Sequence, residues 1–406
     1  MLQSLTLDTD PEAYLELHRM LDEPVADAGL TDRELDLRQR TRSVVAHDVA
    51  PRAAETDRTG RFAHESYQPL VAAGLGGILF PRHLGGSADT TVAYAVIMEE
   101  IAAGCGATSL VYMTQTHAAY PILVAGSPQL QTHYVPGLLR GTAYGSMAIT
   151  EPDAGSDVSG LATVATTDAG GYRLSGAKTF ITTGDRADVI VCFATTDRSA
   201  GRAGISAFVI EGTWPGVSRG RPFQKLGMNG SSTAEIFLDD VPVPVSHRLG
   251  SEGEGWSLVM RSVVKSRISA AAQGVGLAKS AYARALLALR RLHGARLPDQ
   301  TLATLAELRG RILQGRLLLH AVARQVDTDS DVSPGQIGLM KQSCTDLGWH
   351  VADASTRLLG TYGDLEVLGI ERCLRDARVT QIYDGTNEIQ RMLIGREITR
   401  AMDGLR

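Results

Sequence analysis

The stretch Gln381-Ile-Tyr-Asp-Gly-Thr-Asn-Glu-Ile-Gln-Arg391 places a carboxylate, Asp384, in a short turn directly before a helix near the C-terminus. An aspartate in this position commonly caps the following helix, which we expect to begin near Thr386. A carboxylate held in a turn between Tyr383 and Gly385 can also serve as a base. The rest of the sequence bears on which of these roles Asp384 has.

A second stretch, Met147-Ala-Ile-Thr-Glu-Pro-Asp-Ala-Gly-Ser-Asp157, offers hydroxyl groups and free backbone amides to a bound group. Gly155 lets the backbone come close to a ligand, and the amides around Ser156 can bind the phosphates of a dinucleotide. The alternative interpretation is a plain loop that leads into a β region.

Composition excludes several classes of protein. A chain of 406 residues with 44% hydrophobic residues can bury a large core and predicts two or three domains. The net charge of −5 gives no basic excess, so a nucleic-acid partner is not expected. The first residues lack the pattern of a signal peptide and no window is apolar enough to span a bilayer, which predicts a soluble, cytoplasmic protein without a membrane partner.

No metal site is predicted, since the ten histidines are scattered and the four cysteines are too far apart for a CxxC pair. His117, His293 and His350 are interpreted by default as packing or surface residues. The cysteines are expected to be separate buried thiols in a reducing compartment.

The hydrophobic pattern predicts helices in the first part of the chain. Thr31-Asp-Arg-Glu34 has the form of a capping box, and helical spacing follows over 65–73, 91–103 and 107–125. Residues 1–30 look like an N-terminal extension, whose helical spacing over 11–20 would let it pack on a partner subunit.

The pattern changes twice further on. Between about 172 and 240 the period shortens to two, with strands expected over 187–194 and 205–210. From 256 to 292 the chain has no proline and keeps helical spacing, so Gly274-Val-Gly276 fits close helix packing rather than a dinucleotide loop. We therefore expect an extension at 1–30, a helical domain at 31–146, a β domain at 147–250 and a helical bundle at 251–406.

The two quoted stretches and this order of domains resemble the acyl-CoA dehydrogenase family of flavoproteins, from roughly residue 31 to residue 400. The resemblance implies an α+β fold that is mostly α, with an N-terminal helical domain, a small central β-barrel-like domain and a C-terminal four-helix bundle. It also implies FAD as cofactor and a homodimer or homotetramer, because the family shares its cofactor across subunits.

By this resemblance FAD contacts come from several separate segments. His293 stands where the family has a phenylalanine, and Arg357 stands where it has a glutamine; an arginine near a pyrophosphate is chemically suitable. The implied cofactor-binding residues are Met147, Ile149, Thr150, Gly155, Ser156, Phe180, Thr182, Arg290, His293, Arg357, Gly360, Thr361, Thr386 and Glu388.

The resemblance further implies that Asp384 removes the α-proton of an acyl thioester while the flavin accepts the β-hydride. The family usually has a glutamate at this position, so the side chain here is one methylene shorter. The family's other position for a base holds Ser266, which cannot take that role at neutral pH without an activating neighbour. The implied substrate-binding residues are Leu110, Met113, Ser156, Ser266, Arg267, Tyr383 and Gly385.

Alternatives remain open at this point. Val264 replaces an aspartate that in many members meets the pantetheine arm, so the acyl carrier can be CoA or an acyl-carrier protein. Electrons would pass to an electron-transfer flavoprotein or a similar acceptor. A flavin monooxygenase on the same fold is the second hypothesis, and a relative that binds an acyl carrier without turnover is the third.

Overall fold

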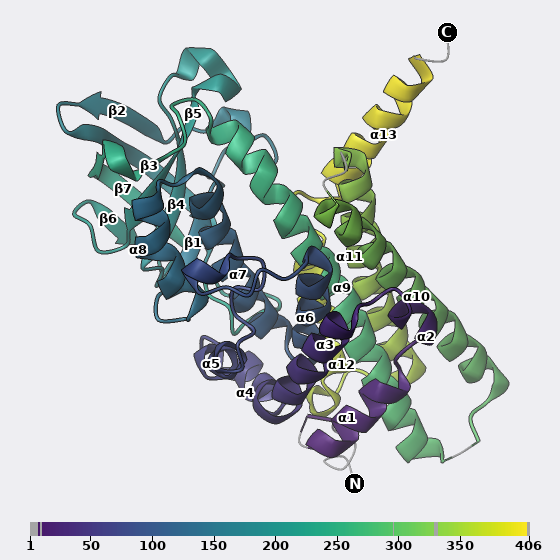
Figure 1. Cartoon of the computed structure of the whole chain (residues 1–406). Coiled ribbons are helices and arrows are strands. Elements are labelled where there is room, and N and C mark those ends of the chain that lie inside the picture. Colours follow the sequence, from purple (N-terminus) through teal and green to yellow (C-terminus); the bar gives the residue numbers. More distant parts are fainter. Residues whose placement is uncertain (1–6, 9, 295, 329–331, 404–406) are drawn as a thin grey trace.

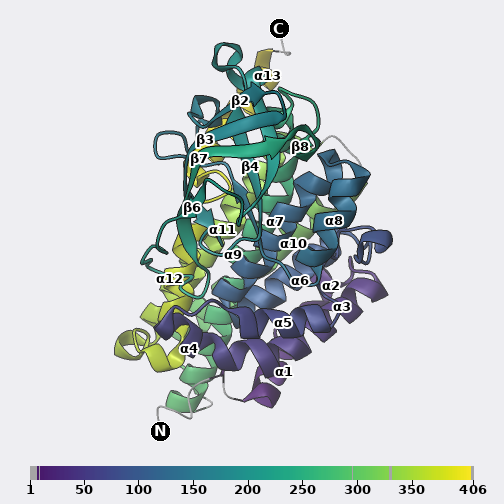
Figure 2. The ribbon, with the colours of Figure 1, turned by 90° about the vertical axis from the view of Figure 1, so that its left-hand side faces the viewer.

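The computed structural model describes residues 7, 8, 10–294, 296–328 and 332–403. It is mostly helical, with strands between two helical parts, which confirms the expected fold class (Figure 1). Figure 2 shows the strands gathered at one end of the molecule, with most of the helices below them. Among the described helices, none combines the length and the apolar character that crossing a bilayer requires.

The first part of the chain is helical, as predicted. The Thr31 capping box is present, because Glu34 N–H donates to Thr31 Oγ1 (3.3 Å) and Thr31 N–H donates to Glu34 Oε2 (2.8 Å). The helices are α1 (Pro11–Met20), α2 (Pro24–Asp27), α3 (Asp32–Val44), a π-helical turn (Val45–Val49), α4 (Ala50–Thr59), α5 (His64–Ala72), α6 (Thr91–Gly104), α7 (Gly106–Ala125) and α8 (Pro128–Leu139).

The central strands form a single sheet with the order β6-β7-β3-β2-β4-β5-β8, and β1 pairs in parallel with β4. β4 is buried along its whole length, which explains its run of valine, isoleucine and phenylalanine. The strands are β1 (Gly145–Ala148), β2 (Val164–Asp168), β3 (Gly171–Thr182), β4 (Val189–Thr195), β5 (Ile205–Glu211), β6 (Val217–Arg219), β7 (Thr233–Pro244) and β8 (Arg248–Leu249).

The C-terminal part is a bundle dominated by α9 (Gly255–His293), α10 (Asp299–Asp327) and α11 (Pro334–Leu358), followed by α12 (Ile370–Thr380) and α13 (Asn387–Asp403). Gly274 is a packing residue, as predicted, because a Cβ there would lie 2.2 Å from the carbonyl oxygen of Cys344. A Cβ at Gly276 would lie 2.4 Å from the carbonyl oxygen of Glu99 on α6. Both glycines therefore let α9 approach its neighbours closely.

The N-terminal extension packs against its own chain. Tyr14 and His18 on α1 are buried and their rings stack with centroids 4.2 Å apart. The four cysteines are buried free thiols, as expected, and burial raises the pKa of each of them.

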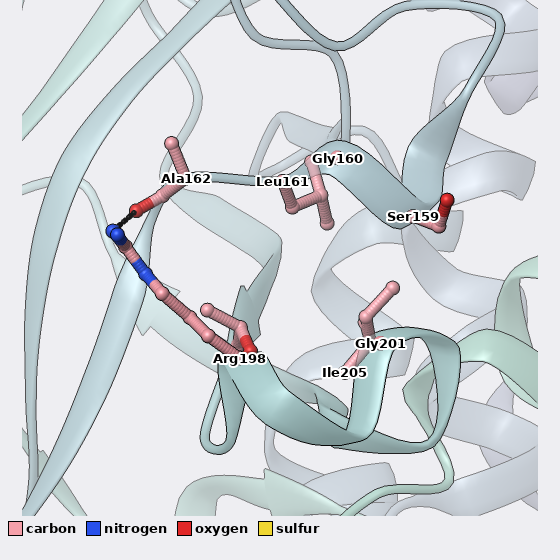
Figure 3. Close-up of a pocket in the computed structure, with 8 residues that line it drawn as sticks. Ser159, Gly160, Leu161, Ala162, Arg198, Gly201 and Ile205 are labelled. Carbon is pink, nitrogen blue, oxygen red and sulfur yellow. Dashed lines mark hydrogen bonds between the residues drawn. The ribbon is translucent and has the colours of Figure 1, made fainter.

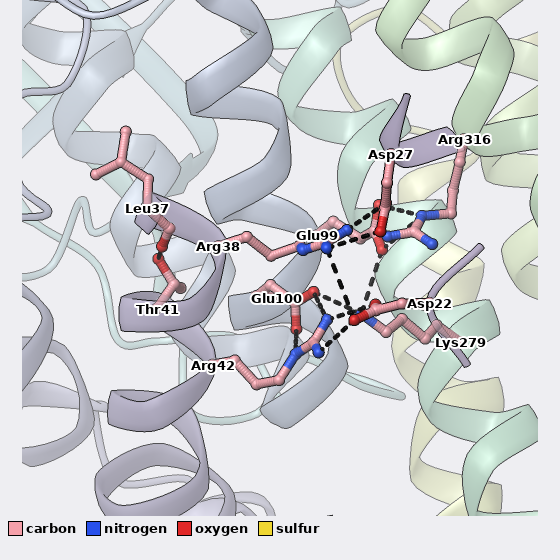
Figure 4. A network of polar contacts seen from close by, with 10 residues as sticks. All are labelled: Asp22, Asp27, Leu37, Arg38, Thr41, Arg42, Glu99, Glu100, Lys279 and Arg316. Carbon is pink, nitrogen blue, oxygen red and sulfur yellow. Dashed lines mark hydrogen bonds and ion pairs between the residues drawn. The ribbon is translucent and has the colours of Figure 1, made fainter. Parts of the chain in front are cut away.

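The extension also completes a buried network of charges (Figure 4). Arg42 donates to both Asp22 (2.8 Å) and Glu100 (2.8 Å), and Lys279 donates to Glu100 (2.6 Å). Although burial raises the pKa of Glu100, Arg42 and Lys279 together hold it well below its usual range. The network comprises the acids Asp22, Asp27, Glu99 and Glu100 and the bases Arg38, Arg42, Lys279 and Arg316.

The signs of these eight groups balance because the extension supplies Asp22 and Asp27. Without these two carboxylates the buried network would carry two uncompensated positive charges. A buried charge without a partner is strongly unfavourable, so the extension stabilises the junction of α3, α6, α9 and α10.

Replacing both Asp22 and Asp27 by asparagine should lower the free energy of unfolding by about 3 kcal/mol or more, because it leaves buried arginines uncompensated. Urea unfolding followed by tryptophan fluorescence measures the change. Asp36→Asn is the matched control, since the Asp36 side chain is 53% exposed on α3. Equal unfolding free energies for the double variant and the control would show that these carboxylates do not stabilise the fold.

Candidate active site

The turn between α12 and α13 has a strained backbone at Asp384. Its φ is +57°, and Gly385 follows with φ +87°. A non-glycine residue in the left-handed region costs about 1–3 kcal/mol and persists where its surroundings enforce it. The φ of Gly385 lies in a region that side-chain-bearing residues rarely adopt, so this position favours glycine.

Side chains from three helices hold the two carbonyl groups of this turn. Arg267 Nε on α9 donates to the carbonyl oxygen of Asp384 (3.2 Å). The carbonyl oxygen of Gly385 accepts from Lys341 Nζ on α11 (3.0 Å) and from Gln390 Nε2 on α13 (2.9 Å). These bonds fix the peptide planes on both sides of Gly385 and therefore the direction of the Asp384 side chain.

The aromatic ring before Asp384 is held as well. The Tyr383 hydroxyl donates to Gln273 Oε1 on α9, and Gln273 Nε2 donates to Ser109 Oγ on α7 (2.8 Å). Lys341 Nζ makes a second bond to Asn387 Oδ1 (2.9 Å), at the start of α13. The turn is therefore tied to α7, α9, α11 and α13.

The carboxylate of Asp384 is not occupied by a structural role. Its Oδ2 atom is buried and has no hydrogen-bond partner among the described residues. Within the same part of the chain its backbone N–H makes no hydrogen bond. The helix cap belongs to Thr386, whose Oγ1 accepts from Ile389 N–H (3.3 Å), so the interpretation of Asp384 as the cap of α13 is wrong.

Two buried cations lie close to Asp384. Burial lowers the pKa of Arg267, whereas the charge of Asp384 raises it. Burial also lowers the pKa of Lys341, to about 8, against the opposing effect of Asp384. Ser266, which directly precedes Arg267, is buried and donates to the carbonyl oxygen of Val263 (3.1 Å) in its own helix.

The loop after β1 is held from below by a buried ion pair. Lys178 Nζ donates to Glu151 Oε1 (2.6 Å) and to the carbonyl oxygen of Phe193 (2.5 Å). The Glu151 carboxylate also accepts from the N–H groups of Ala162 (2.6 Å) and Thr163 (3.1 Å). The anchored loop exposes residues 155–157, and no described residue accepts from the N–H of Gly155 or Ser156.

Phe180 lies next to this loop in a strained conformation. Its φ is +54°, its side chain is 66% exposed, and it sits in the irregular pairing of β3 with β7. Thr179 N–H donates to the carbonyl oxygen of Thr150 (2.9 Å), which joins β3 to the loop. An exposed aromatic ring beside unpaired amides fits a cofactor that has a flat ring system and phosphates, as FAD does. Met147, Ile149 and Thr182 are half-buried in the same two segments.

The remaining predicted cofactor residues lie elsewhere. Arg290 and His293 are exposed at the far end of α9, and Arg290 lies 23 residues beyond Arg267, or about 35 Å along the helix. Arg357 is exposed in the last turn of α11, and Gly360 and Thr361 are exposed just beyond that end of the helix. Since α9 and α11 run in the same direction, one chain does not bring these residues to Asp384.

The parallel course of α9 and α11 follows from paired contacts. Arg267 and Lys341 both bind the turn, and one to two helical turns further on a Cβ at Gly348 would meet the carbonyl oxygen of Gly274 at 2.8 Å. Glu388, another predicted cofactor residue, is exposed on α13, where its carboxylate lies 3.7 Å from Arg391.

Several buried polar residues around the turn were not predicted from the sequence. Lys341 and Gln273 are fully buried, but polar residues are frequent in α11 and α9, so no local pattern marked these two. His117 lies seven residues after Leu110 and four after Met113, so the three share one face of α7. Leu110 and Met113, the predicted acyl-binding residues, are themselves buried.

A separate cavity of about 250 Å³ lies at the outer edge of the β domain (Figure 3). The guanidinium of Arg198 closes one wall by donating to the carbonyl oxygen of Ala162 (2.9 Å). No residue of the turn at 381–386 lines this cavity, so it is distinct from the surroundings of Asp384.

The chain matches three domain families in order: the N-terminal domain of acyl-CoA dehydrogenases over residues 31–142, the middle domain over 146–241 and the C-terminal domain over 253–399. A short-chain specific acyl-CoA dehydrogenase of Clostridium acetobutylicum is 34% identical over 381 residues, covering 92% of this chain and 100% of that protein.

Two solved structures are also similar. The butyryl-CoA dehydrogenase of Megasphaera elsdenii has a TM-score of 0.87 and 31% identity, covering 91% of this chain and 99% of that one. The prolyl acyl carrier protein oxidase AnaB has a TM-score of 0.86 and 25% identity, covering 91% of this chain and 100% of that one.

Lys341 should give the stability a characteristic pH dependence. Its pKa is lowered from 10.5 to about 8 in the folded chain, so between these values the unfolded chain binds more protons and stability rises with pH. The unfolding free energy of the wild type, relative to Lys341→Met, should therefore increase by about 3 kcal/mol from pH 8 to pH 10.5.

Urea unfolding of both proteins across this range measures the difference, and other titrating groups cancel because the two proteins share them. A difference that does not vary with pH would mean that Lys341 titrates at its ordinary value.

Proposed function

This chain belongs to the acyl-CoA dehydrogenase family and is an oxidoreductase acting on CH–CH bonds, and we propose that Asp384 is the base that removes the α-proton of its acyl thioester substrate. FAD, when bound, supplies the acceptor for the hydride that leaves the β-carbon. The observation that carries the proposal is the buried Oδ2 atom of Asp384, which has no hydrogen-bond partner among the described residues.

The residue offers two groups that act together. Its backbone N–H is unpaired within the described chain, so it can donate to the thioester carbonyl and polarise it. The carboxylate then takes the α-proton. This proton is more acidic because the hydrogen bond stabilises the negative charge that develops on the carbonyl oxygen. Arg267 and Lys341 keep both groups in register by holding the carbonyls of the turn.

The shorter side chain has a geometric consequence. An aspartate reaches about 1.5 Å less far than a glutamate, roughly one carbon–carbon bond. The strained backbone at Asp384 is held so firmly that the turn has little freedom to move toward the substrate. We infer that the acyl group enters more deeply toward α9 than it would with a glutamate as base.

Residues of the β domain would hold the pyrophosphate and the flat ring system of the cofactor. The free N–H groups of Gly155 and Ser156 suit the pyrophosphate, and the exposed ring of Phe180 suits stacking on the flat ring system. Met147, Ile149, Thr150 and Thr182 would line the same space, while Thr386 and Glu388 would approach it from α13.

The distant residues support a shared cofactor. Arg290, His293, Arg357, Gly360 and Thr361 would reach the FAD of a neighbouring copy, which requires at least a homodimer and fits a homotetramer. α13 carries the exposed apolar residues Met392, Ile398 and Met402, which suit a subunit interface. The electron acceptor would be an electron-transfer flavoprotein or a similar protein.

Two carriers of the acyl group fit the comparisons, CoA and an acyl carrier protein. The name of the Megasphaera elsdenii butyryl-CoA dehydrogenase specifies a CoA thioester, and the name of the prolyl acyl carrier protein oxidase AnaB specifies an acyl carrier protein. Both names describe acyl thioesters, which favours dehydrogenation over the alternative of a flavin monooxygenase.

Asp384→Asn should reduce the rate of anaerobic flavin reduction by roughly 100-fold or more, the range expected when a general base is removed. Stopped-flow bleaching of the flavin with butyryl-CoA or the matching carrier-protein thioester measures it. Asp384→Glu is the control, because it restores a carboxylate and should keep measurable activity. Reduction of the Asn variant at the wild-type rate, with FAD bound, would refute the assignment.

Arg290→Glu should weaken FAD binding by roughly tenfold or more, because a guanidinium near phosphate would be replaced by a carboxylate. Arg291→Glu is the control with the same charge change on a different face of α9. Dialysis against buffer, followed by flavin absorbance, compares FAD retention in the two variants. If both retain FAD like the wild type, Arg290 does not contact the cofactor of any copy.

A further inference from the structure

Three buried polar side chains from different helices meet near the turn of Asp384. Tyr94 on α6 and His117 on α7 both bind Ser269 on α9, with Tyr94 Oη 2.8 Å and His117 Nε2 3.3 Å from Ser269 Oγ. The exposed fractions are 1%, 8% and 0% for Tyr94, His117 and Ser269. We refer to these residues as the Tyr94–Ser269–His117 cluster.

The hydrogen bonds of the cluster are all satisfied when His117 carries its proton on Nε2. The Ser269 hydroxyl donates its single proton to the carbonyl oxygen of Lys265 (3.0 Å). With the Ser269 proton assigned to this bond, the Ser269 oxygen accepts from both Tyr94 Oη–H and His117 Nε2–H. His117 Nδ1 therefore carries no proton when the ring is neutral, and it makes no hydrogen bond to any described residue. Burial lowers the pKa of His117, which favours this neutral form, and Asp384 is the charge that opposes the shift.

The cluster lies next to the turn that carries the proposed base. Ser269 and Gln273 are four residues apart on the same face of α9, and Gln273 Oε1 accepts a hydrogen bond from the hydroxyl of Tyr383, the residue before Asp384. His117 shares its face of α7 with Leu110 and Met113. The charge of Asp384 also raises the pKa of Tyr94, so its field reaches both rings of the cluster.

We propose that the Tyr94–Ser269–His117 cluster lines the acyl end of the substrate cavity and selects an acyl group bearing a hydroxyl or amine donor beyond the β-carbon, which His117 Nδ1 accepts. The inference rests on the proposed function, since it assumes an acyl thioester beside Asp384. A plain alkyl chain would desolvate the free nitrogen without giving it a partner, and that is unfavourable. A donor on the acyl group removes the penalty.

Two thioesters of pantetheine test the selection. 4-Hydroxybutyryl-pantetheine and pentanoyl-pantetheine differ by a hydroxyl against a methyl group, and the pantetheine carrier avoids the choice between CoA and a carrier protein. The FAD-loaded protein is titrated with each, by the perturbation of the flavin spectrum, and flavin reduction is then timed anaerobically. The wild type should bind the hydroxyacyl compound roughly tenfold or more tightly, in line with the difference between a satisfied and an unsatisfied buried acceptor.

His117→Leu should abolish or reverse this ratio, whereas Thr114→Val should preserve it. Thr114 is the matched control on α7, because its hydroxyl donates to the carbonyl oxygen of Leu110 (2.7 Å) and not to the cluster. If His117→Leu fails to fold or to retain FAD, Ser269→Ala replaces it. That variant frees Nε2–H and lets the ring present a donor to the cavity, so the ratio should also fall.

The two readouts separate the inference from the function on which it rests. Preferred binding of the hydroxyacyl compound without flavin reduction supports the cluster and refutes dehydrogenation by Asp384. Equal affinities in the wild type, preference for the pentanoyl compound, or an unchanged ratio in His117→Leu overturns the inference, and so does failure of the FAD-loaded protein to bind either compound.

Discussion

The carbonyl groups of Asp384 and Gly385 accept hydrogen bonds from buried cations on two parallel helices, and the rest of the site depends on these bonds. Arg267 and Lys341 hold a backbone whose φ of +57° would otherwise relax. Both bonds form only if α9 and α11 pack side by side, and the close contact between Gly274 and Gly348 allows this packing. The packing of the bundle therefore determines the conformation of the turn, and the turn determines the direction of the Asp384 carboxylate.

A second set of charges stabilises the bundle where α3 and α6 meet α9. The acids of the N-terminal extension neutralise Arg38 and Arg42, which would otherwise leave a net positive charge where α3 and α6 meet α9. The extension precedes the part of the chain that matches the family, since that match begins at residue 31. It supports the fold around the site without contributing a residue to the turn of Asp384.

Local patterns in the sequence predicted much of the fold. The capping box at Thr31, the long proline-free helix α9 and the strands β4 and β5 each follow from short-range rules, and the motif around Asp384 predicted a turn directly before a helix, which the structure has. The contacts of that turn could not be predicted in this way, because Arg267 and Lys341 are 117 and 44 residues away from the atoms they bind. His117 was interpreted as a packing or surface residue because its partner Ser269 is 152 residues away in the sequence.

The central claim is that Asp384 removes the α-proton, and loss of deuterium from the α-carbon tests it most directly. An α-deuterated acyl thioester that the FAD-loaded protein binds is incubated anaerobically in ordinary water, without an electron acceptor, and its deuterium content is followed by mass spectrometry. The account predicts exchange in the wild type that depends on Asp384 and is lost in Asp384→Asn. Exchange at an equal rate in that variant would contradict it and would assign the base to another residue.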